Sequence, residues 1–522
     1  MRWLVGLLIA GVMSSLSVSW RQAPVKDELV YGGGLVPRGL NPLLEKNDWS
    51  EVSCLILSRL FQIDEQGQLL PDLVERYTVS PDGLTYTFVL RRNVVWHDGV
   101  PFTPEDVRFT FDMIFAPNTK TAYDADLSMV KTYAAKAPDT FIVILSAPSS
   151  SFLSKLSDPP ILPRHILDGQ DINGEAFEKN PVGTGPYTLI QKVSDREWVF
   201  ERNARFHLSA NPTPIKRILL RIVPDDDERA RMAAAGAFHI TQVKPQHIAM
   251  LKQNPDLAVY RFPSGAWRGM PQNLRRSFIQ DRRVRQAISH AIDREVIVKE
   301  ALMGAGQAAY LPVPPGSPVY DPSLFKPGRD VARAKALLAE AGWKPGPDGI
   351  LQKDGQRFEY RIGIWKDEIF RRLSGDLIKR QLAEVGIPVD LDLVDNTRYQ
   401  QIGDDMGTTH DTIIGGWSGL LDPDMNLSKK FSLKGSQNYM KYTSPDVDRL
   451  LERGRTIAEP AQRKAVYREL LTILRDDAVF IPLVYPDYVF VAQKNVRGLR
   501  DGMTVDSWYH FTRNAYKWSL AE

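Results

Sequence analysis

Two short motifs contain residue types that could do chemistry: a serine between glycines and a histidine beside an aspartate. Residues 416–419 read GWSG, but the second glycine comes one position too early for the GxSxG turn of serine hydrolases. His97 lies in the WHDG segment of residues 96–99, where a turn histidine bonded to backbone explains it without a metal. The eight histidines include no pair at metal-ligand spacing beside a glutamate. We therefore expect neither catalytic nor metal-binding residues.

Glycine-rich and acidic segments do not indicate a cofactor either. The segments at residues 32–34, 183–186 and 304–306 complete neither a dinucleotide-binding motif nor a phosphate-binding loop. The acidic run at residues 225–228 follows Pro224, and acids in the first turn of a helix explain it better than a metal site does. The sequence therefore predicts no cofactor.

The composition is that of a large folded protein without a polyanionic partner. The chain has 522 residues, 43% of them hydrophobic, so it can bury a sizeable core. Its 66 basic and 63 acidic residues leave a net charge of +3, and the pairs of basic residues are scattered. Nucleic-acid binding needs a concentrated basic face. We expect no nucleic-acid partner.

The N-terminus has the layout of a secretory signal peptide over residues 1–22. A positive start at Arg2 precedes an apolar run from Trp3 to Met13 and then small polar residues. The run is shorter than the ~20 residues that span a bilayer, and no second run of membrane length follows. No cysteine stands behind it to carry a lipid, and the single Cys54 lies in an apolar segment that favours a buried thiol. We expect an exported, periplasmic protein without a membrane span or a lipid anchor.

Strand and helix signals are mixed along the chain and predict an α/β protein. Residues 84–90 place apolar side chains at every second position after a turn signal, which indicates a strand. Thr103, followed by Pro104 and two acids, indicates the start of a helix. The proline-rich residues 311–322 are typical of an ordered irregular loop. Amphipathic helices are predicted around residues 284–292, 334–341, 444–451 and 459–474.

Several ordered motifs, taken together, are typical of one family. The chain resembles the family 5 extracellular solute-binding proteins, which are the dipeptide- and oligopeptide-binding components of ABC importers. The resemblance runs from about Leu29 to the C-terminus. It is carried by residues 33–42, 60–61, 70–73, PDGLTYTF at 81–88, WHDG at 96–99 with PFTPEDV at 101–107, GTGPY at 183–187, DRRVRQAI at 281–288 with AIDR at 291–294, and IPL at 481–483.

The resemblance implies a fold class and a division of the chain. The fold would be an α/β clam-shell of two lobes, the type II periplasmic-binding-protein fold of cluster C, with two chain crossings and ligand bound between the lobes. Residues 27–50, 183–265 and 485–522 would form the main part of lobe I. Residues 51–182 would be a subdomain inserted in lobe I, and residues 266–484 would form lobe II.

The resemblance also places Trp417 at the cleft, and the residues after it depart from the family pattern. In related proteins an aspartate three residues after this tryptophan pairs with the ammonium group of the peptide, and this chain has Leu420 there. The ligand-binding candidates Asp422 and Asp424 follow, and Asp422 could replace the missing carboxylate. The alternative is a turn in which both side chains cap backbone groups.

Further ligand-binding candidates are aromatic and polar. Trp267 and Trp365 could sandwich side chains or sugar rings, although packing in the core explains them equally well. Arg268 could hold a carboxylate through two parallel hydrogen bonds, or it could be a surface residue. The resemblance places Asn438 and Tyr439 near the cleft.

The function that follows is transport-linked binding without catalysis. We expect a monomeric periplasmic protein that binds a peptide-like solute and delivers it to an ABC permease in the inner membrane. Because the usual aspartate is missing, an oligosaccharide, an opine or a metal chelate stays open as the ligand. A ligand-presenting sensory protein is a further possibility. A periplasmic hydrolase is another, but the sequence offers no nucleophile with a base at recognisable spacing for it.

Overall fold

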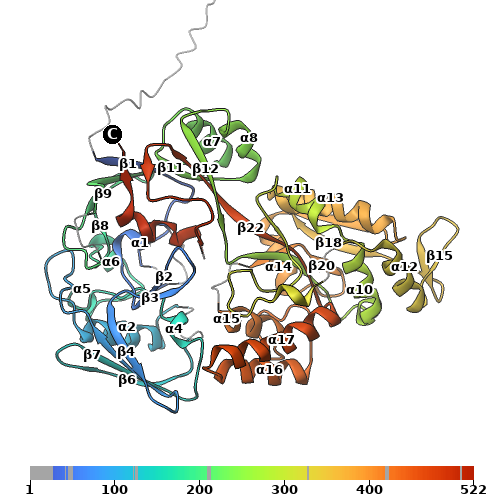
Figure 1. Cartoon of the computed structure of the whole chain (residues 1–522), viewed down its shortest axis with the longest axis horizontal. Helices are drawn as coiled ribbons and strands as arrows, with labels where there is room; N and C mark the ends of the chain where they lie inside the picture. Colours follow the sequence, from blue (N-terminus) through green and yellow to red (C-terminus); the bar gives the residue numbers. More distant parts are fainter. Residues whose placement is uncertain are drawn as a thin grey trace, which may run out of the picture.

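The computed structural model of the protein describes residues 27–521, except residues 42, 45–50, 122, 124–126, 209–212, 326–327, 418–421 and 506–507. The expected signal peptide at residues 1–22 and Leu420 lie outside the described residues. Among the described helices, none is both long and apolar enough to cross a membrane. Two lobes lie side by side, one mostly blue and green and the other mostly yellow and orange (Figure 1).

A long strand, β22 (Phe480–Gln493), joins the two lobes (Figure 1). Its first half pairs with β13 and β14, and its second half pairs with β11 and β12. The sheet that results has the order β21-β13-β22-β11-β1-β10-β9-β8. Residues 264–266, between β12 and β13, form the second crossing between the lobes. The strands that accompany β22 are β1 (Glu28–Gly33), β8 (Tyr187–Ser194), β9 (Glu197–Arg202), β10 (Arg217–Ile222), β11 (Ile240–Val243), β12 (Leu257–Pro263), β13 (Trp267–Pro271), β14 (Gly306–Ala308) and β21 (Gly415–Trp417).

The rest of the first lobe contains a four-stranded antiparallel sheet of order β4-β5-β7-β6. The alternation expected at residues 84–90 is confirmed in β5, where every second side chain is buried. The helix expected at Thr103 begins there as α2, and the Thr103 N–H donates to Asp106 at 2.8 Å. The elements of this lobe outside the shared sheet are α1 (Glu51–Ile56), β2 (Phe61–Ile63), β3 (Leu69–Pro71), β4 (Val74–Val79), β5 (Thr85–Leu90), α2 (Pro104–Phe115), β6 (Val130–Lys136), β7 (Thr140–Leu145), α4 (Phe152–Lys155), α5 (Arg164–Leu167), α6 (Ala176–Lys179), α7 (Asp226–Ala234), the 3-10 helix η1 (Pro245–His247), α8 (Ile248–Leu251), β23 (Val496–Arg497), the 3-10 helix η3 (Trp508–Lys517) and β24 (Ser519–Leu520).

The second lobe packs helices around a small parallel sheet of order β19-β18-β20. Its helices α16 and α17 begin after Ser444 and Glu459, whose side chains accept hydrogen bonds from first-turn N–H groups, as the sequence predicts. The elements of this lobe outside the shared sheet are α9 (Ser277–Gln280), α10 (Arg282–Ala291), α11 (Arg294–Ala301), the 3-10 helix η2 (Pro322–Leu324), α12 (Val331–Glu340), β15 (Lys344–Pro345), β16 (Leu351–Lys353), β17 (Gln356–Arg357), β18 (Tyr360–Trp365), α13 (Ile369–Ala383), β19 (Val389–Val394), α14 (Asn396–Asp404), β20 (Thr412–Ile413), α15 (Pro423–Phe431), α16 (Pro445–Thr456) and α17 (Pro460–Asp477).

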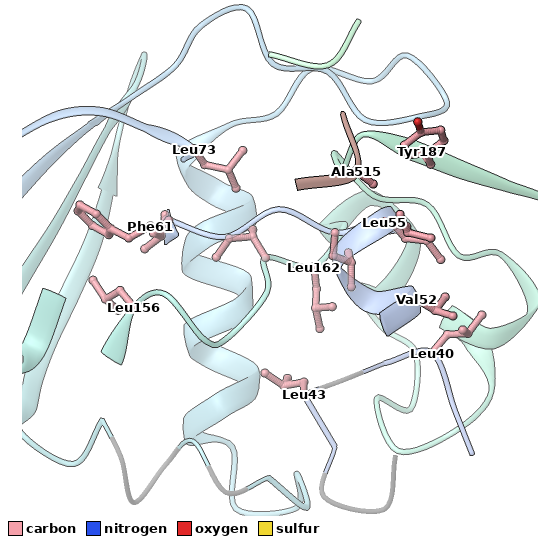
Figure 2. Close-up of a cluster of buried hydrophobic side chains, with 14 of the residues drawn as sticks. Leu40, Leu43, Val52, Leu55, Phe61, Leu73, Leu156, Leu162, Tyr187 and Ala515 are labelled. Carbon is pink, nitrogen blue, oxygen red and sulfur yellow. The ribbon is translucent and has the colours of Figure 1, made fainter. Parts of the chain in front are cut away.

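Each lobe has hydrophobic cores of its own. The largest cluster belongs to the first lobe, where α1 packs against Tyr187 of β8 and Ala515 of η3 (Figure 2). Cys54 is buried in α1, which confirms the expected buried thiol. Two further clusters lie in the second lobe, one around its parallel sheet and one around α15–α17. Because separate cores stabilise the lobes separately, relative motion of the lobes leaves most buried contacts intact.

One buried carboxyl makes the first lobe sensitive to pH. Glu51 accepts a hydrogen bond from the Tyr31 hydroxyl at 2.5 Å. Burial raises the pKa of Glu51 to about 7, although that hydrogen bond and nearby Arg229 act in the opposite direction. A glutamate in the unfolded chain has a pKa of about 4.3. The folded state therefore holds this proton more tightly, and its contribution to stability is present below pH ~4 and is lost as the pH rises through ~7.

Glu51→Gln is expected to remove this pH dependence, because the amide oxygen still accepts from Tyr31 and carries no charge. The free energy of unfolding of the variant minus that of the wild type should increase by up to about 3 kcal/mol from pH 5 to pH 8, because only the wild type loses stability over this range. Urea unfolding at the two pH values measures the difference. A difference that is the same at both pH values would show that Glu51 does not titrate in this range. The exposed Glu452 gives a matched control, Glu452→Gln.

Candidate functional site

A cavity of about 450 Å³ lies between the lobes, beside the crossing strand β22. This volume is in the range of small-molecule sites. The first lobe contributes the loop after β1, the start of α7 and residues 242–246 to its lining, and the second lobe contributes Arg268, the end of α11 and residues 368–370. Residues 486–489 of β22 line it between the two lobes. Since both lobes line this cavity, closure of the lobes can enclose a solute there.

Arg268 is the cation of this cavity that has no acidic partner. Its guanidinium donates to the Trp267 carbonyl at 3.3 Å, and no carboxylate of the described residues lies within 4 Å of it. Burial lowers its pKa, and Glu368 partly offsets that effect. An uncompensated charge in such a site is costly, so an anionic group of a solute would stabilise it.

Gly416 makes room for this arginine. The two residues are paired across β13 and β21. A Cβ atom at Gly416 would lie 2.4 Å from Cδ and 2.7 Å from Cζ of Arg268. Because Gly416 has no side chain, the arginine side chain can cross the neighbouring strand at this position.

The acidic residues of the cavity differ in whether they are paired. Asp226 forms ion pairs with Arg229 and with Lys244. Glu368 pairs with Arg371 at 3.2 Å. Asp487 of β22 has no ion-pair partner within 4 Å among the described residues. Burial raises its pKa to about 6, against the influence of Arg261. The cavity thus offers one unpaired cation and one unpaired carboxyl group.

Trp267 and Trp417 pack against each other. Their rings stack with centroids 4.9 Å apart, and Phe480 contacts both edge-on. Trp267 is fully buried, whereas Trp417 is half-buried. The Lys430 ammonium lies about 5.5 Å from both ring centres, and burial lowers the pKa of Lys430 to about 7. Neither tryptophan lines the cavity, and packing in the core describes Trp267.

Trp365 and Tyr439 lie together in a second aromatic group, next to Arg371. The Arg371 guanidinium is 5.3 Å from the ring centre of Trp365 and 4.4 Å from that of Tyr399. Trp365 and Tyr439 pack on the same small cluster of buried side chains. Arg371 itself pairs with Glu368, which lines the cavity. Trp365 therefore packs beside a residue that is paired with the cavity wall, and it does not line the cavity itself.

Asn438 uses its amide within its own loop. Its side-chain N–H groups donate to the carbonyls of Ser432 and Tyr442, and its oxygen accepts from the Tyr442 N–H at 3.0 Å. All of these partners belong to the second lobe. The residue stabilises the loop between α15 and α16, and it has little hydrogen-bonding capacity left for a solute.

Asp422 and Asp424 are both engaged inside the protein. Asp422 caps α15 by accepting from the Asp424 N–H at 3.0 Å, and it forms two parallel hydrogen bonds with Arg463 at 2.8 and 2.9 Å. Asp424 accepts from Ser428 and from Arg455. Both carboxylates are therefore neutralised by buried or half-buried arginines, and the capping interpretation describes Asp422.

A second set of polar contacts joins the lobes at the end of α16. The Ser150 N–H donates to the Arg455 carbonyl at 2.8 Å, and the Ser150 hydroxyl donates to the carbonyls of Gly454 and Arg455. The Ser151 hydroxyl donates to Asp424 at 3.2 Å. Ser150 and Ser151 precede α4 in the first lobe, so this serine contact links the lobes away from β22 (Figure 1).

Ser150→Ala/Ser151→Ala is expected to shift the lobes toward an open arrangement. A hydrogen bond of this kind contributes about 0.5–1.5 kcal/mol, and each hydroxyl has one hydrogen to donate, so losing both hydroxyls should change the closed-to-open ratio by about 5- to 150-fold. Small-angle X-ray scattering of the ligand-free protein should give a larger radius of gyration. Ser154→Ala, on α4, is the control, because its hydroxyl makes no hydrogen bond to the second lobe among the described residues. An unchanged radius of gyration in the double variant would contradict this role.

Two sequence expectations outside the cleft are also settled by geometry. His97 bonds to backbone, accepting from the Gly183 N–H at 3.2 Å and lying 3.1 Å from the Gly185 carbonyl, and burial lowers its pKa to about 4. The partner backbone belongs to the distant GTGPY segment instead of its own turn. Asp225 caps α7 by accepting from the Glu228 N–H, which confirms the capping interpretation of the acidic run. No cluster of three potential metal ligands occurs in the part of the chain that the structure describes.

The fold and the cavity define a class, the two-lobed binding proteins that enclose a solute. The sequence profile of the bacterial extracellular solute-binding proteins, family 5 Middle, matches residues 68–439. The chain therefore belongs to family 5 of the bacterial extracellular solute-binding proteins, and the type II fold expected from the sequence is confirmed.

Relatives with different ligands share this fold. Protein XP55 of Streptomyces lividans is 30% identical over 91% of this chain and 86% of its own length. The oligopeptide-binding protein AppA of Bacillus subtilis is 26% identical over 95% of this chain and 92% of its own. The solved structure of AppA with a nonapeptide has a TM-score of 0.77 at 25% identity, over 95% of this chain and 99% of AppA. NikZ of Campylobacter jejuni in complex with Ni(L-His) has a TM-score of 0.79 at 26% identity, over 95% of this chain and all of NikZ.

Proposed function

We propose that this protein is the periplasmic substrate-binding component of an ABC importer and that it binds a peptide-like solute with a free carboxylate. The observation that carries the proposal is Arg268, a half-buried cation without an acidic partner among the described residues that lines the cavity between the lobes. A solute carboxylate can accept two hydrogen bonds from one guanidinium, and such a contact is favoured where water is excluded.

The ammonium end of the solute is assigned to Asp487. The other acids of the cavity, Asp226 and Glu368, are already paired with arginines. The family position after Trp417 holds leucine, so the carboxylate usual in related proteins is missing. A solute ammonium beside Asp487 would favour the ionised carboxylate and lower its raised pKa. Arg268 and Asp487 together select a zwitterion.

Delivery follows from the two-lobed design. The lobe boundaries that we propose are residues 27–50, 183–265 and 485–522 for lobe I, 51–182 for its inserted subdomain, and 266–484 for lobe II. A solute that binds both lobes favours the closed state by its difference in affinity for the closed and open states. The closed monomer would present the solute to a permease in the inner membrane, with export directed by residues 1–22, no lipid anchor and no catalytic step.

Native mass spectrometry of the mature protein, from about Ala23 onward, tests the proposal. A tight solute often survives purification, because at 100 times the dissociation constant it stabilises the protein by about 2.7 kcal/mol. Release of a short peptide on mild denaturation is the expected result. A sugar without a carboxylate would overturn the role of Arg268. A carboxylate without an amine, such as a metal chelate, would keep that role and exclude Asp487 as the ammonium partner.

A further inference from the structure

The second lobe contains another cavity, which shares no lining residue with the cavity between the lobes. Its volume is about 370 Å³, large enough for a small organic molecule. It is lined by α10, Arg294 at the start of α11, α12, the C-terminal end of α17 and the first residues of β22, together with Tyr310, Pro312, Leu324, Phe325 and Gly328. We refer to it as the lobe II cavity.

Arg294 places a buried positive charge on the lobe II cavity. The residue is 5% exposed, and burial lowers its pKa to about 10. Its guanidinium donates to uncharged oxygens only, at the carbonyls of Pro482, Ser289 and Ile292 and at the Ser289 hydroxyl. No carboxylate of the described residues lies within 4 Å of it. A buried guanidinium without an anion nearby is an unfavourable arrangement unless a ligand supplies the anion.

The other charged residues of this cavity do not neutralise Arg294. Asp476 is the acidic residue among those that line the cavity, and it forms an ion pair with Arg475. Arg333 is paired with Glu340, outside the cavity. His290 is half-buried, and burial lowers its pKa. The net charge that faces the cavity is therefore positive, which favours an anion.

Two stacked aromatic rings form part of the remaining wall. Tyr310 and Phe325 stack with ring centres 4.8 Å apart and an interplanar angle of 10°. The Arg294 guanidinium lies 5.1 Å from the ring centre of Tyr310. Other apolar lining residues are Leu324, Leu337, Leu474, Pro312, Pro482, Ala478 and Phe480, and Gln286 and Ser289 add polar groups. Aromatic walls of this kind favour an aromatic ring, which packs offset or edge-on against them.

We propose that the lobe II cavity binds a small aromatic carboxylate, with the carboxylate facing Arg294 and the ring against Tyr310 and Phe325. This site is separate from the cleft and does not depend on the solute that the cleft takes. Free inorganic anions lack the apolar body that this lining favours, so they should bind less well.

Isothermal titration calorimetry of the full mature protein with phenylacetate tests the site, and phenylacetamide is the uncharged control. We expect one molecule of phenylacetate per chain, with an affinity in the millimolar range or tighter for a ligand of about ten non-hydrogen atoms. The amide should bind at least about 10-fold more weakly, because its uncharged carbonyl can accept a hydrogen bond from Arg294 but cannot form an ion pair with it. An absence of saturable binding, or equal binding of the two compounds, would overturn the proposal.

Single substitutions test whether phenylacetate binds in the lobe II cavity. His290→Trp places a large ring in the cavity at a half-buried position and should abolish phenylacetate binding. Lys335→Trp, at an exposed position of α12 outside the lining, is the matched control and should leave it unchanged. Arg268→Ala, in the cleft, should also leave it unchanged. Binding that survives His290→Trp, or that is lost in Arg268→Ala, would place phenylacetate elsewhere and would overturn the assignment.

Discussion

Replacing Asp422 by alanine is expected to destabilise the protein by about 3–5 kcal/mol. The carboxylate is 6% exposed and Arg463 is 10% exposed, and the two form a bidentate pair. The variant leaves the Arg463 guanidinium buried without its anion, which is the costly way to break such a pair. It also removes the cap of α15. Chemical denaturation monitored by circular dichroism measures the decrease in the free energy of unfolding.

Two further variants test whether the uncompensated charge of Arg463 causes this loss of stability. Asp446→Ala removes one partner of an exposed pair, in which Asp446 is 62% and Arg449 is 61% exposed, so its effect should stay below about 1 kcal/mol. Asp422→Ala/Arg463→Met should recover much of the lost stability, because no charge is then left buried. A stable Asp422→Ala variant that has lost its solute would instead show that this carboxylate serves the ligand.

Local signals in the sequence predicted the elements well. Thr103 before Pro104, and Glu459 before Pro460, each begin a helix because capping is decided by residues within one turn. The alternation at residues 84–90 predicted a strand because side chains of a strand point to opposite faces in turn. These interactions join residues that are close in the chain, so the local sequence is enough to predict them.

The role of each candidate site residue depended on partners that are distant in the chain. Trp267 and Arg268 are neighbours on β13, and the period of a strand sends one into the core and the other to the cavity. The sequence does not say which of the two faces is the core. Asp422 meets Arg463 across 41 positions, so the sequence left both ligand binding and a cap open for it and did not indicate the ion pair.

Residues that the sequence analysis did not single out show the same limit. Arg371 and Lys430 each belong to a pair of adjacent basic residues, in α13 and α15, yet both lie over aromatic rings. Asp487 follows the IPL motif in a strand that crosses from one lobe to the other, and its exposure to the cavity depends on that crossing. The one available signal was an acid within an otherwise apolar strand.

Arg268→Ala is expected to release the solute of the cleft. Removing one partner of a buried charge-assisted contact costs about 2–5 kcal/mol, so the affinity should fall by at least about 30-fold. Native mass spectrometry of the variant, purified in the same way as the wild type, should show most molecules without the adduct. The fold should remain, because the guanidinium hydrogen-bonds to a single backbone carbonyl at 3.3 Å.

Gly416→Ala tests the same contact without touching the arginine itself. The added Cβ would lie 2.4 Å from Cδ of Arg268, a flexible side chain, so the arginine must move and the backbone need not. Solute occupancy should fall while the unfolding transition changes little. Gly403→Ala, in α14, is the matched control, since its Cβ would meet only the Ile413 side chain at an ordinary 3.5 Å. If Gly416→Ala keeps full occupancy, the position of the Arg268 guanidinium does not determine binding, and the carboxylate of the solute must be held elsewhere in the cleft.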